Sequence, residues 1–145
     1  MLVPGSNRSI FGVDSHVGIA VTGYPSDGRQ IVNRARDEAR TYKENYGHQI
    51  IPSVLTNRVA LYVHYFTLYG SLRPFGVSTI LSAFDQDLQI PELYMIDPSG
   101  TAFKFFGCAA GRGANAAKTE LEKILNRYGN DGITCEDAVK ELAKM

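Results

Sequence analysis

The spacing of hydrophobic residues changes in blocks along the chain, and the order of these blocks restricts the fold. Residues 8–24 and 76–110 show the two-residue alternation of strands, whereas residues 29–69 and 116–142 repeat apolar residues every three or four positions, as helices do. The pattern predicts a strand hairpin, a helix pair, three strands and a second helix pair. Because the helices come in pairs, we expect a layered α+β fold with helices covering a mainly antiparallel sheet, and not alternating βαβ units.

The first helix pair has a distinct apolar stripe on each helix. The first helix is expected to end at Gly47, and the second to open near Pro52 and end at Gly70. Large apolar residues crowd residues 62–69, which predicts that this half of the second helix is buried on most sides. The expected stripes are Ile31, Ala35, Ala39, Tyr42 and Tyr46, then Leu55, Val59, Tyr62, Val63, Phe66 and Tyr69.

The later strands are predicted from alternation and from one turn. Residues 76–85 carry apolar groups on both faces, which is typical of a strand covered on both sides. Residues 92–97 and 101–110 are joined by Asp97-Pro98-Ser99-Gly100, whose residue types suit the successive positions of a β-turn. We therefore expect residues 76–110 to form an antiparallel three-stranded meander.

Two short helices are expected to close the chain. Residues 129–132 break the pattern, and Thr134 is expected to cap the last helix with Asp137 at the capping-box position. The predicted buried stripes are Ala117, Leu121, Ile124, Leu125 and Tyr128, then Cys135, Ala138, Val139 and Leu142.

Composition excludes several classes of protein. The 145 residues suit one domain, and 15 basic residues balance 15 acidic ones, which argues against a nucleic-acid partner. No apolar run approaches the length of about 18 residues that spans a bilayer, so no membrane partner is expected. The two cysteines provide neither a disulfide framework nor a zinc knuckle and suit a reducing compartment.

Two glycine-rich signals near residue 111 point to nucleotide chemistry, but their context is wrong. Residues 111–116 match the dinucleotide fingerprint, yet the preceding strand belongs to a meander where that site needs a parallel βαβ unit. Lys118-Thr119 resembles the end of a phosphate loop, but Ala117 stands where the motif requires glycine. We interpret these glycines as allowing close strand-to-helix packing, and we expect no cofactor.

The remaining reactive side chains also favour structural roles. A cysteine–histidine pair could be drawn from Cys108 or Cys135, but both lie on apolar patterns and are interpreted as core thiols. The histidines, His16, His48 and His64, share no metal-ligand spacing, so no metal site is expected. The basic residues of the first helix alternate with acidic ones and predict a solvated face or a protein contact; they are Arg34, Arg36, Arg40 and Lys43.

Motifs distributed through residues 5–145 resemble proteasome alpha-type subunits. The strings 62–64, 93–100 and 116–120 are most similar to the type-three class of that family. The segments that carry the resemblance are residues 13–20, 27–29, 35–39, 62–64, 67–69, 73–76, 93–100, 107–109 and 116–123.

The resemblance implies a four-layer αββα sandwich of the N-terminal-nucleophile hydrolase type. The family's N-terminal helix and first strands would precede Leu2, and its last strands would follow Met145. We therefore expect residues 1–145 to be a single domain that is truncated at both ends. The family's activator-pocket lysine and gate tyrosine would lie in the preceding part.

The resemblance further implies a non-catalytic ring subunit in ubiquitin-dependent protein degradation. Expected partners are other alpha subunits, beta-ring subunits and a regulatory particle or activators, in the cytoplasm and nucleus. The family's beta relatives use a processed N-terminal threonine, whereas the one Gly-Thr pair here, Gly100-Thr101, lies in a turn. No catalytic residue is expected, and the motif turns are expected to be structural: Arg73, Pro74, Phe75 and Gly76, then Asp97, Pro98, Ser99 and Gly100.

One alternative from the enzyme class stays open. An N-terminal-nucleophile hydrolase of the threonine type shares the same sandwich. It would need Thr, Ser or Cys at a mature N-terminus.

Overall fold

The chain folds into α+β structure, as its hydrophobic pattern predicts. The computed structural model describes residues 8–129 and 133–144, which belong to two compact units. Unit 1 comprises residues 1–105 and unit 2 comprises residues 106–145. Each unit is described separately below.

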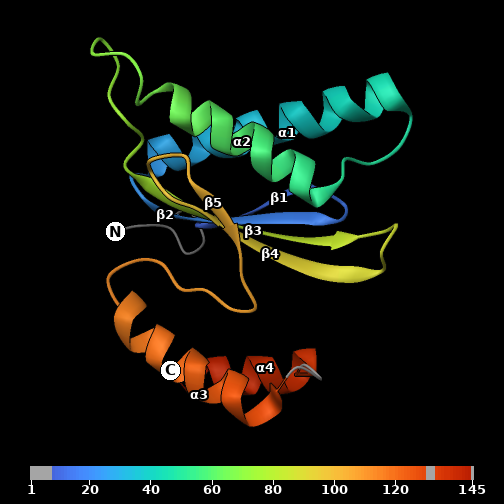
Figure 1. The fold of residues 1–145 in the computed structure, drawn as a ribbon, viewed down its shortest axis with the longest axis vertical. Helices are drawn as coiled ribbons and strands as arrows, with labels where there is room; N and C mark the ends of the chain where they lie inside the picture. The colour runs from blue at the N-terminus through green and yellow to red at the C-terminus, as the bar shows by residue number, and fades with distance from the viewer. Residues whose placement is uncertain (1–7, 130–132, 145) are drawn as a thin grey trace. The chain divides into compact units, whose positions relative to one another are not determined.

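Unit 1 contains an antiparallel sheet of five strands (Figure 1). The strands follow one another in sequence order, β1-β2-β3-β4-β5, so each pairs with its neighbour along the chain. The predicted hairpin and the predicted meander are both confirmed. The strands are β1 (Ile10–Asp14), β2 (Val17–Gly23), β3 (Val77–Asp85), β4 (Ile90–Ile96) and β5 (Ala102–Lys104).

Strand β5 is shorter than the predicted range of 101–110, and Pro91 explains why. Phe105 donates its backbone N–H to Leu93 O at 2.8 Å, which is the last bond of the β4–β5 ladder. Continuing that register would place Gly107 opposite Pro91, which has no N–H to donate. The prediction is therefore wrong for residues 105–110.

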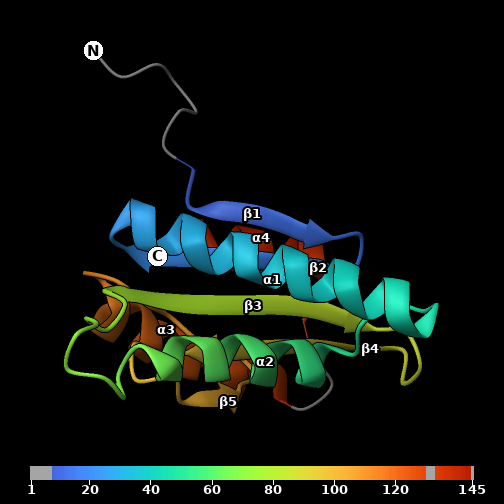
Figure 2. The same cartoon turned by 90° about the horizontal axis from the view of Figure 1, so that it is seen from above.

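Two helices, α1 (Pro25–Tyr46) and α2 (Pro52–Tyr65), cover one face of this sheet (Figures 1 and 2). Each begins with proline, whose missing N–H is harmless in a first turn. Helix α1 ends at Gly47, as predicted, with φ of 77° and a bond from its N–H to Lys43 O. Among residues 8–129 and 133–144, no helix is long and apolar enough to cross a membrane.

The hydrophobic core lies between these helices and the sheet. The predicted α1 stripe is confirmed except at Tyr46, which is exposed. On α2 the stripe is buried at its three aliphatic positions and half-buried at Tyr62 and Phe66. The buried side chains that meet there include Val17, Ile19, Ile31, Val32, Ala35, Leu55, Val59, Val63, Leu81 and Ile96.

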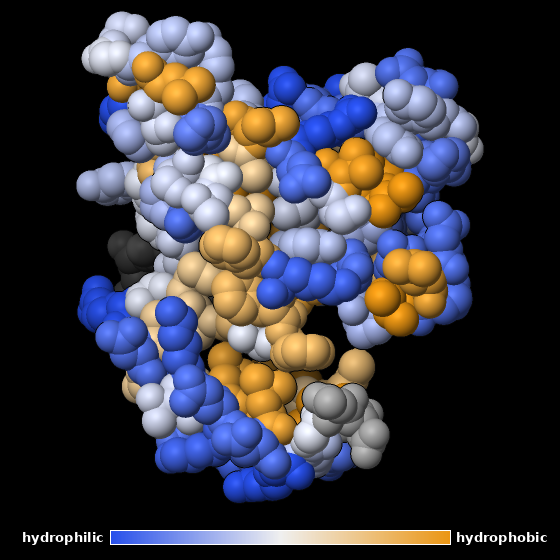
Figure 3. Space-filling model, in the orientation of Figure 1, coloured by the Kyte–Doolittle hydropathy of each residue, from blue (hydrophilic) through white to orange (hydrophobic). Residues whose placement is uncertain are grey.

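The prediction that residues 62–69 are buried on most sides is wrong. Helix α2 ends at Tyr65 and not at Gly70, and Tyr65, Leu68 and Tyr69 are exposed. The chain leaves the sheet once the helix ends, so Leu68 and Tyr69 have no layer to pack on. Figure 3 shows apolar surface on this segment, at the upper left.

The opposite face of the sheet carries apolar side chains that the helices of unit 1 do not cover. Along β3, residues at odd positions are buried under the helices, whereas those at even positions are half-buried or exposed, Phe84 among them. Phe103 on β5 is exposed and pairs with Met95, on this same face. Unit 1 thus supplies one helix layer and one sheet of the expected sandwich.

The described residues of unit 2 form two helices, whose predicted buried stripes are only partly covered. In α3 (Ala114–Tyr128) the stripe is half-buried and Leu125 is exposed, and in α4 (Cys135–Leu142) Val139 and Leu142 are exposed. Two short helices have too little neighbouring surface to form a closed core. The predicted Thr134 cap is confirmed, since its Oγ1 accepts a bond from Asp137 N. Residues 130–132 of the predicted break lie outside the described residues.

The apolar sheet face that the helices of unit 1 leave uncovered predicts that the 145-residue chain associates with itself when purified. Exposed apolar surface on a sheet favours association. Replacing both Phe84 and Phe103 by serine should lower the association detected by sedimentation velocity across a concentration series. Leu61→Ser, on the exposed surface of α2, is the matched control and should leave association unchanged. A monomer that melts cooperatively at low concentration would contradict this expectation.

Candidate functional site: two anchors between helices and sheet

The first anchor is a buried carboxylate in the first turn of α1. Asp27 is 6% exposed and accepts two parallel bonds from Arg73, Nη1 to Oδ2 at 2.7 Å and Nη2 to Oδ1 at 2.8 Å. The backbone N–H of Gly76 adds a third bond to Oδ2 at 3.0 Å. Asp27 therefore holds the start of α1 against the segment that leads into β3.

These bonds also set the charge state of Asp27. The hydrogen bonds from Arg73 and then from Gly76 N–H lower the pKa of Asp27 from 3.8 to about 2, against the opposing effect of burial. In turn, Asp27 raises the pKa of Arg73. Because Arg73 is 68% exposed, solvent screens the pair, so the fixed geometry contributes more than the charge attraction does.

Gly76 leaves room for the ring of Tyr24 where this segment crosses the start of α1. A Cβ on Gly76 would lie 2.4 Å from the ring of Tyr24, whose backbone N–H donates to Gly76 O at 3.0 Å. Phe75 is buried, with its ring centroid 4.5 Å from that of Phe66. Arg73, Phe75 and Gly76 of the predicted Arg73–Gly76 motif thus each make contacts where the chain enters β3.

The second anchor is the turn between β4 and β5, organised by Asp97. Asp97 Oδ1 accepts bonds from Ser99 N at 2.9 Å, from Ser99 Oγ at 2.5 Å and from Thr101 N at 3.0 Å. Burial disfavours the ionised carboxylate, but the bonds from Ser99 and Thr101 outweigh it and hold the pKa of Asp97 below its ordinary value. The backbone N–H of Gly100 completes the turn by donating to Asp97 O.

This turn packs directly on the backbone of α2. His64 Nδ1 donates to Ser99 O at 3.0 Å, and Gly100 adopts φ of 83°. A Cβ on Gly100 would lie 2.6 Å from His64 N and 2.7 Å from Ala60 O. Only glycine allows both this conformation and this approach.

A third group, which the sequence analysis missed, joins β4 to β5. Glu92 is buried and accepts bonds from Lys104 Nζ at 2.5 Å and from the Tyr94 hydroxyl at 2.8 Å. Burial, followed by the bond to Glu92, raises the pKa of Tyr94 to about 12. The sequence does carry a signal for this group, because Glu92 and Tyr94 lie two positions apart on one strand and therefore share a face.

The basic residues of α1 are mostly held by partners within unit 1. Arg34 Nη2 lies 2.5 Å from Glu38, which also accepts a bond from Arg58, and Arg40 bonds Asp37 at 2.7 Å. Arg36 donates two bonds to Gly12 O on the edge strand β1. This arrangement agrees with a solvated face and not with a phosphate-binding cluster.

The histidines serve as donors to backbone carbonyl groups. His16 Nε2 bonds Ile50 O at 2.8 Å and His48 Nδ1 bonds Gln49 O at 3.0 Å, as His64 bonds Ser99 O. A carbonyl oxygen only accepts, so the ring nitrogen donates in each case. Within the described part of the chain, no hydrogen bond joins a histidine to a cysteine, and no three potential ligands form a metal-binding group.

The cysteines differ from each other. Cys108 is half-buried, and burial raises its pKa, so it is a poor nucleophile. Cys135 is exposed, so its interpretation as a core thiol is wrong. It lies on α4, whose apolar stripe is only partly covered within unit 2.

The nucleotide motifs have no supporting context. Residues 111–113 precede α3, but every strand pairing in unit 1 is antiparallel, so the parallel unit of a dinucleotide site is missing from the described residues. Thr119 Oγ1 donates to Asn115 O within α3, as an ordinary helical threonine does.

Comparison with known proteins agrees with the resemblance seen in the sequence. The family described as "Proteasome subunit" matches residues 1–145. The chain is 50% identical over 145 residues to proteasome subunit alpha type-3 of Arabidopsis thaliana, covering 100% of this chain and 56% of the relative. The type-3 subunit of Dictyostelium discoideum is 45% identical over the same shares, and the probable alpha type-7 subunit of Saccharomyces cerevisiae is 41% identical over 100% of this chain and 49% of its own length. The chain therefore spans about half the length of the curated relatives it matches.

The first anchor predicts a specific loss of stability in acid. Because the folded pKa of Asp27 is about 2 and the ordinary value is 3.8, its contribution is complete above pH 4 and is lost as the pH falls from 4 to 2. Asp27→Asn should lower the free energy of unfolding at pH 7 by about 1–3 kcal/mol and flatten the profile in that window. Urea unfolding at several pH values measures both effects. Asp37→Asn, at an exposed position of the same helix, should leave the slope intact.

The second anchor predicts that replacing Gly100 by alanine lowers the stability more than replacing Gly47, although both glycines have a left-handed conformation. Gly47→Ala introduces a Cβ into open space at φ of 77° and should cost about 1–2 kcal/mol. Gly100→Ala adds the collision with α2 and should cost about 1–3 kcal/mol more. Equal losses in urea unfolding would show that the turn does not press on α2.

Proposed function

Since this chain belongs to the proteasome subunit family, we propose that it acts as a non-catalytic structural subunit of the alpha ring of the 20S proteasome core. One observation carries the proposal: identity of 50% to an alpha type-3 subunit extends along all 145 residues. The relatives quoted above are all named as alpha types.

The geometry supports a structural role for the family motifs. Arg73 is committed to Asp27, and Asp97 to the backbone of its own turn. His64 binds Ser99 O. Side chains that are engaged in this way position helices on a sheet, as a ring subunit requires, and none is poised as a nucleophile with an adjacent base.

The proposed role includes partners and a cellular setting. The subunit would contact other alpha subunits and the beta ring, and would support assembly, substrate gating and the docking of a regulatory particle or other activators. It would serve ubiquitin-dependent protein degradation in the cytoplasm and nucleus.

The alternative, a threonine-type hydrolase, has less support. The sequence contains one Gly-Thr pair, Gly100-Thr101. The backbone N–H of Thr101 donates a hydrogen bond to Asp97 Oδ1. Cleavage before Thr101 would cut the connection between β4 and β5. Freeing an N-terminal amine there would therefore dismantle the second anchor.

The proposal predicts that the protein assembles into 20S particles and does not react with a probe for catalytic threonines. A tagged protein that carries this sequence, expressed in a eukaryotic cell, should sediment with 20S particles and remain unmodified by a threonine-directed vinyl sulfone probe. The beta subunits in the same fraction provide the positive control for the probe. Sedimentation apart from the particle would contradict the ring role. Probe attachment to this chain, detected by intact mass, would favour the hydrolase.

A further inference from the structure

The sheet of unit 1 has one face that α1 and α2 leave uncovered, and every residue on that face is uncharged (Figure 1). A partner that buries this face must itself be uncharged there, because a charge sealed against apolar side chains loses its hydration. The strand register assigns to the face Ile10, Gly12, Gly18, Ala20, Thr22, Ser78, Ile80, Ser82, Phe84, Pro91, Leu93, Met95, Phe103 and Phe105.

Small and large side chains are separated on this face. Two rows run across the strands from β1 to β5, namely Ile10, Ala20, Ile80, Met95 and Phe103, and next to it Gly12, Gly18, Ser82, Leu93 and Phe105. In both rows β2 contributes a small residue, whereas β4 and β5 contribute large ones. The face is therefore low over β2 and high over β4 and β5.

We propose that this face docks on the same face of a second copy of the chain, about a two-fold axis that runs along β3. Such an axis places β2 of one copy over β4 of the other and β1 over β5. Each row then meets its own reverse, so Gly18 lies opposite Leu93 of the second copy and Ala20 lies opposite its Met95. Large side chains thus enter the spaces over small ones, as stacked sheets require at their separation of about 10 Å.

The area of the face is sufficient for a stable pair. At about 3.3 Å per residue and about 4.8 Å between strands, the five strands present roughly 500 Å² of flat area. Two copies therefore bury about 1,000 Å², and the relief of the side chains adds to this flat area. A specific interface needs a total of about 1,000 Å².

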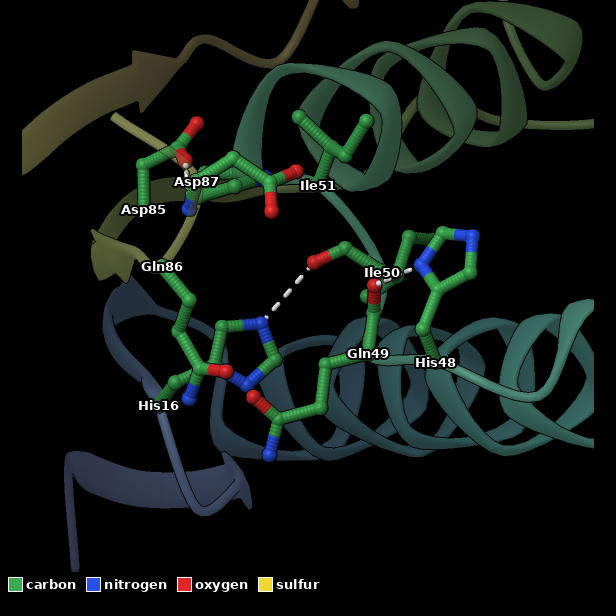
Figure 4. A pocket seen from close by; sticks show the side chains of 9 residues that line it. His16, His48, Gln49, Ile50, Ile51, Asp85, Gln86 and Asp87 are labelled. Atoms are coloured by element: carbon green, nitrogen blue, oxygen red, sulfur yellow. Dashed lines mark hydrogen bonds between the residues drawn. The ribbon is translucent and has the colours of Figure 1, made fainter. Parts of the chain in front are cut away.

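The sheet that carries this face is held in place by the helix layer behind it. At one end, His16 of the β1–β2 turn donates from Nε2 to Ile50 O, in the loop between α1 and α2, at 2.8 Å (Figure 4). Elsewhere the bonds between Asp27 and Arg73 fix the start of α1. A face that keeps its shape in the free chain loses little conformational freedom on docking.

The proposed pair closes on itself. Each copy uses its uncovered face once, so the two-fold arrangement stops at two chains. The layers would then follow the order helices, sheet, sheet, helices, with the second sheet supplied by the second copy. The inference concerns the free 145-residue chain and does not rest on the ring role.

Crosslinking on the whole chain tests the position of the axis. Ile10→Cys and Phe103→Cys are made separately, each with Cys108→Ser and Cys135→Ser, at sites that are 76% and 63% exposed. The axis leaves β1 about 10 Å from β5 of the second copy but about 20 Å from its β1. With bismaleimidoethane, a mixture of the two variants should therefore give at least about fivefold more crosslinked dimer than either variant alone.

Gly18→Phe separates this docking from general apolar adhesion. A Cβ at Gly18 would lie 3.9 Å from Phe11 O, an ordinary contact, so a single copy accommodates a side chain there. In the pair, the added ring would collide with Leu93 of the second copy, and the dimer dissociation constant should rise at least about tenfold. Leu61→Phe, on the exposed surface of α2, is the matched control and should leave this constant unchanged.

Sedimentation velocity across a concentration series should show one monomer–dimer equilibrium. A chain that stays monomeric at every concentration, because its own residues cover the face, would overturn the proposal. Growth beyond the dimer, equal crosslinking in the mixture and in the separate variants, or tighter association of Gly18→Phe would also overturn it. None of these results changes the expected co-sedimentation with 20S particles, so the two proposals fail independently.

Discussion

The bond pair between Asp27 and Arg73 fixes how the helix layer begins on the sheet. A carboxylate that is almost fully buried needs donors, and here one guanidinium and one backbone N–H supply them. Because those donors lie just before β3, the start of α1 and the start of the central strand are held together. The core then forms between two layers whose ends are already aligned, with Leu81 and Ile31 fully buried between them.

The second anchor uses backbone packing where the first uses directed hydrogen bonds to a buried carboxylate. The β4–β5 turn touches α2 through Gly100, at a distance that no side chain would permit. The two anchors lie on different helices, so α1 and α2 are each tied to the sheet by an independent device. Glu38, which receives bonds from Arg34 and Arg58, then links the two helices to each other. Rigid placement of a helix pair suits a protein whose proposed role is to offer fixed surfaces to neighbours.

Local periodicity and turn chemistry were sufficient to predict the elements, the hairpin and the meander, but not the pairing of β2 with β3 that joins them into one sheet. The hairpin, the meander, the Gly47 stop and the Thr134 cap each depend on residues close together in sequence. The errors arose where residues distant in sequence determine the length of a strand or the burial of a side chain. The length of β5 depends on Pro91 across the ladder, and the exposure of residues 65–69 depends on where the sheet ends. The bond between Asp27 and Arg73 spans 46 positions, so motif resemblance marked both residues without indicating that they meet.

Arg36 has a consequence for how the sheet behaves at its open border. The bond from Val21 N to Ser9 O fixes the pairing of β1, so Gly12 directs its carbonyl away from β2. Arg36 covers that carbonyl with two bonds. An incoming strand must displace a guanidinium before it can extend the ladder at this position. A residue that reads as surface charge therefore closes one hydrogen-bonding position of the sheet's edge.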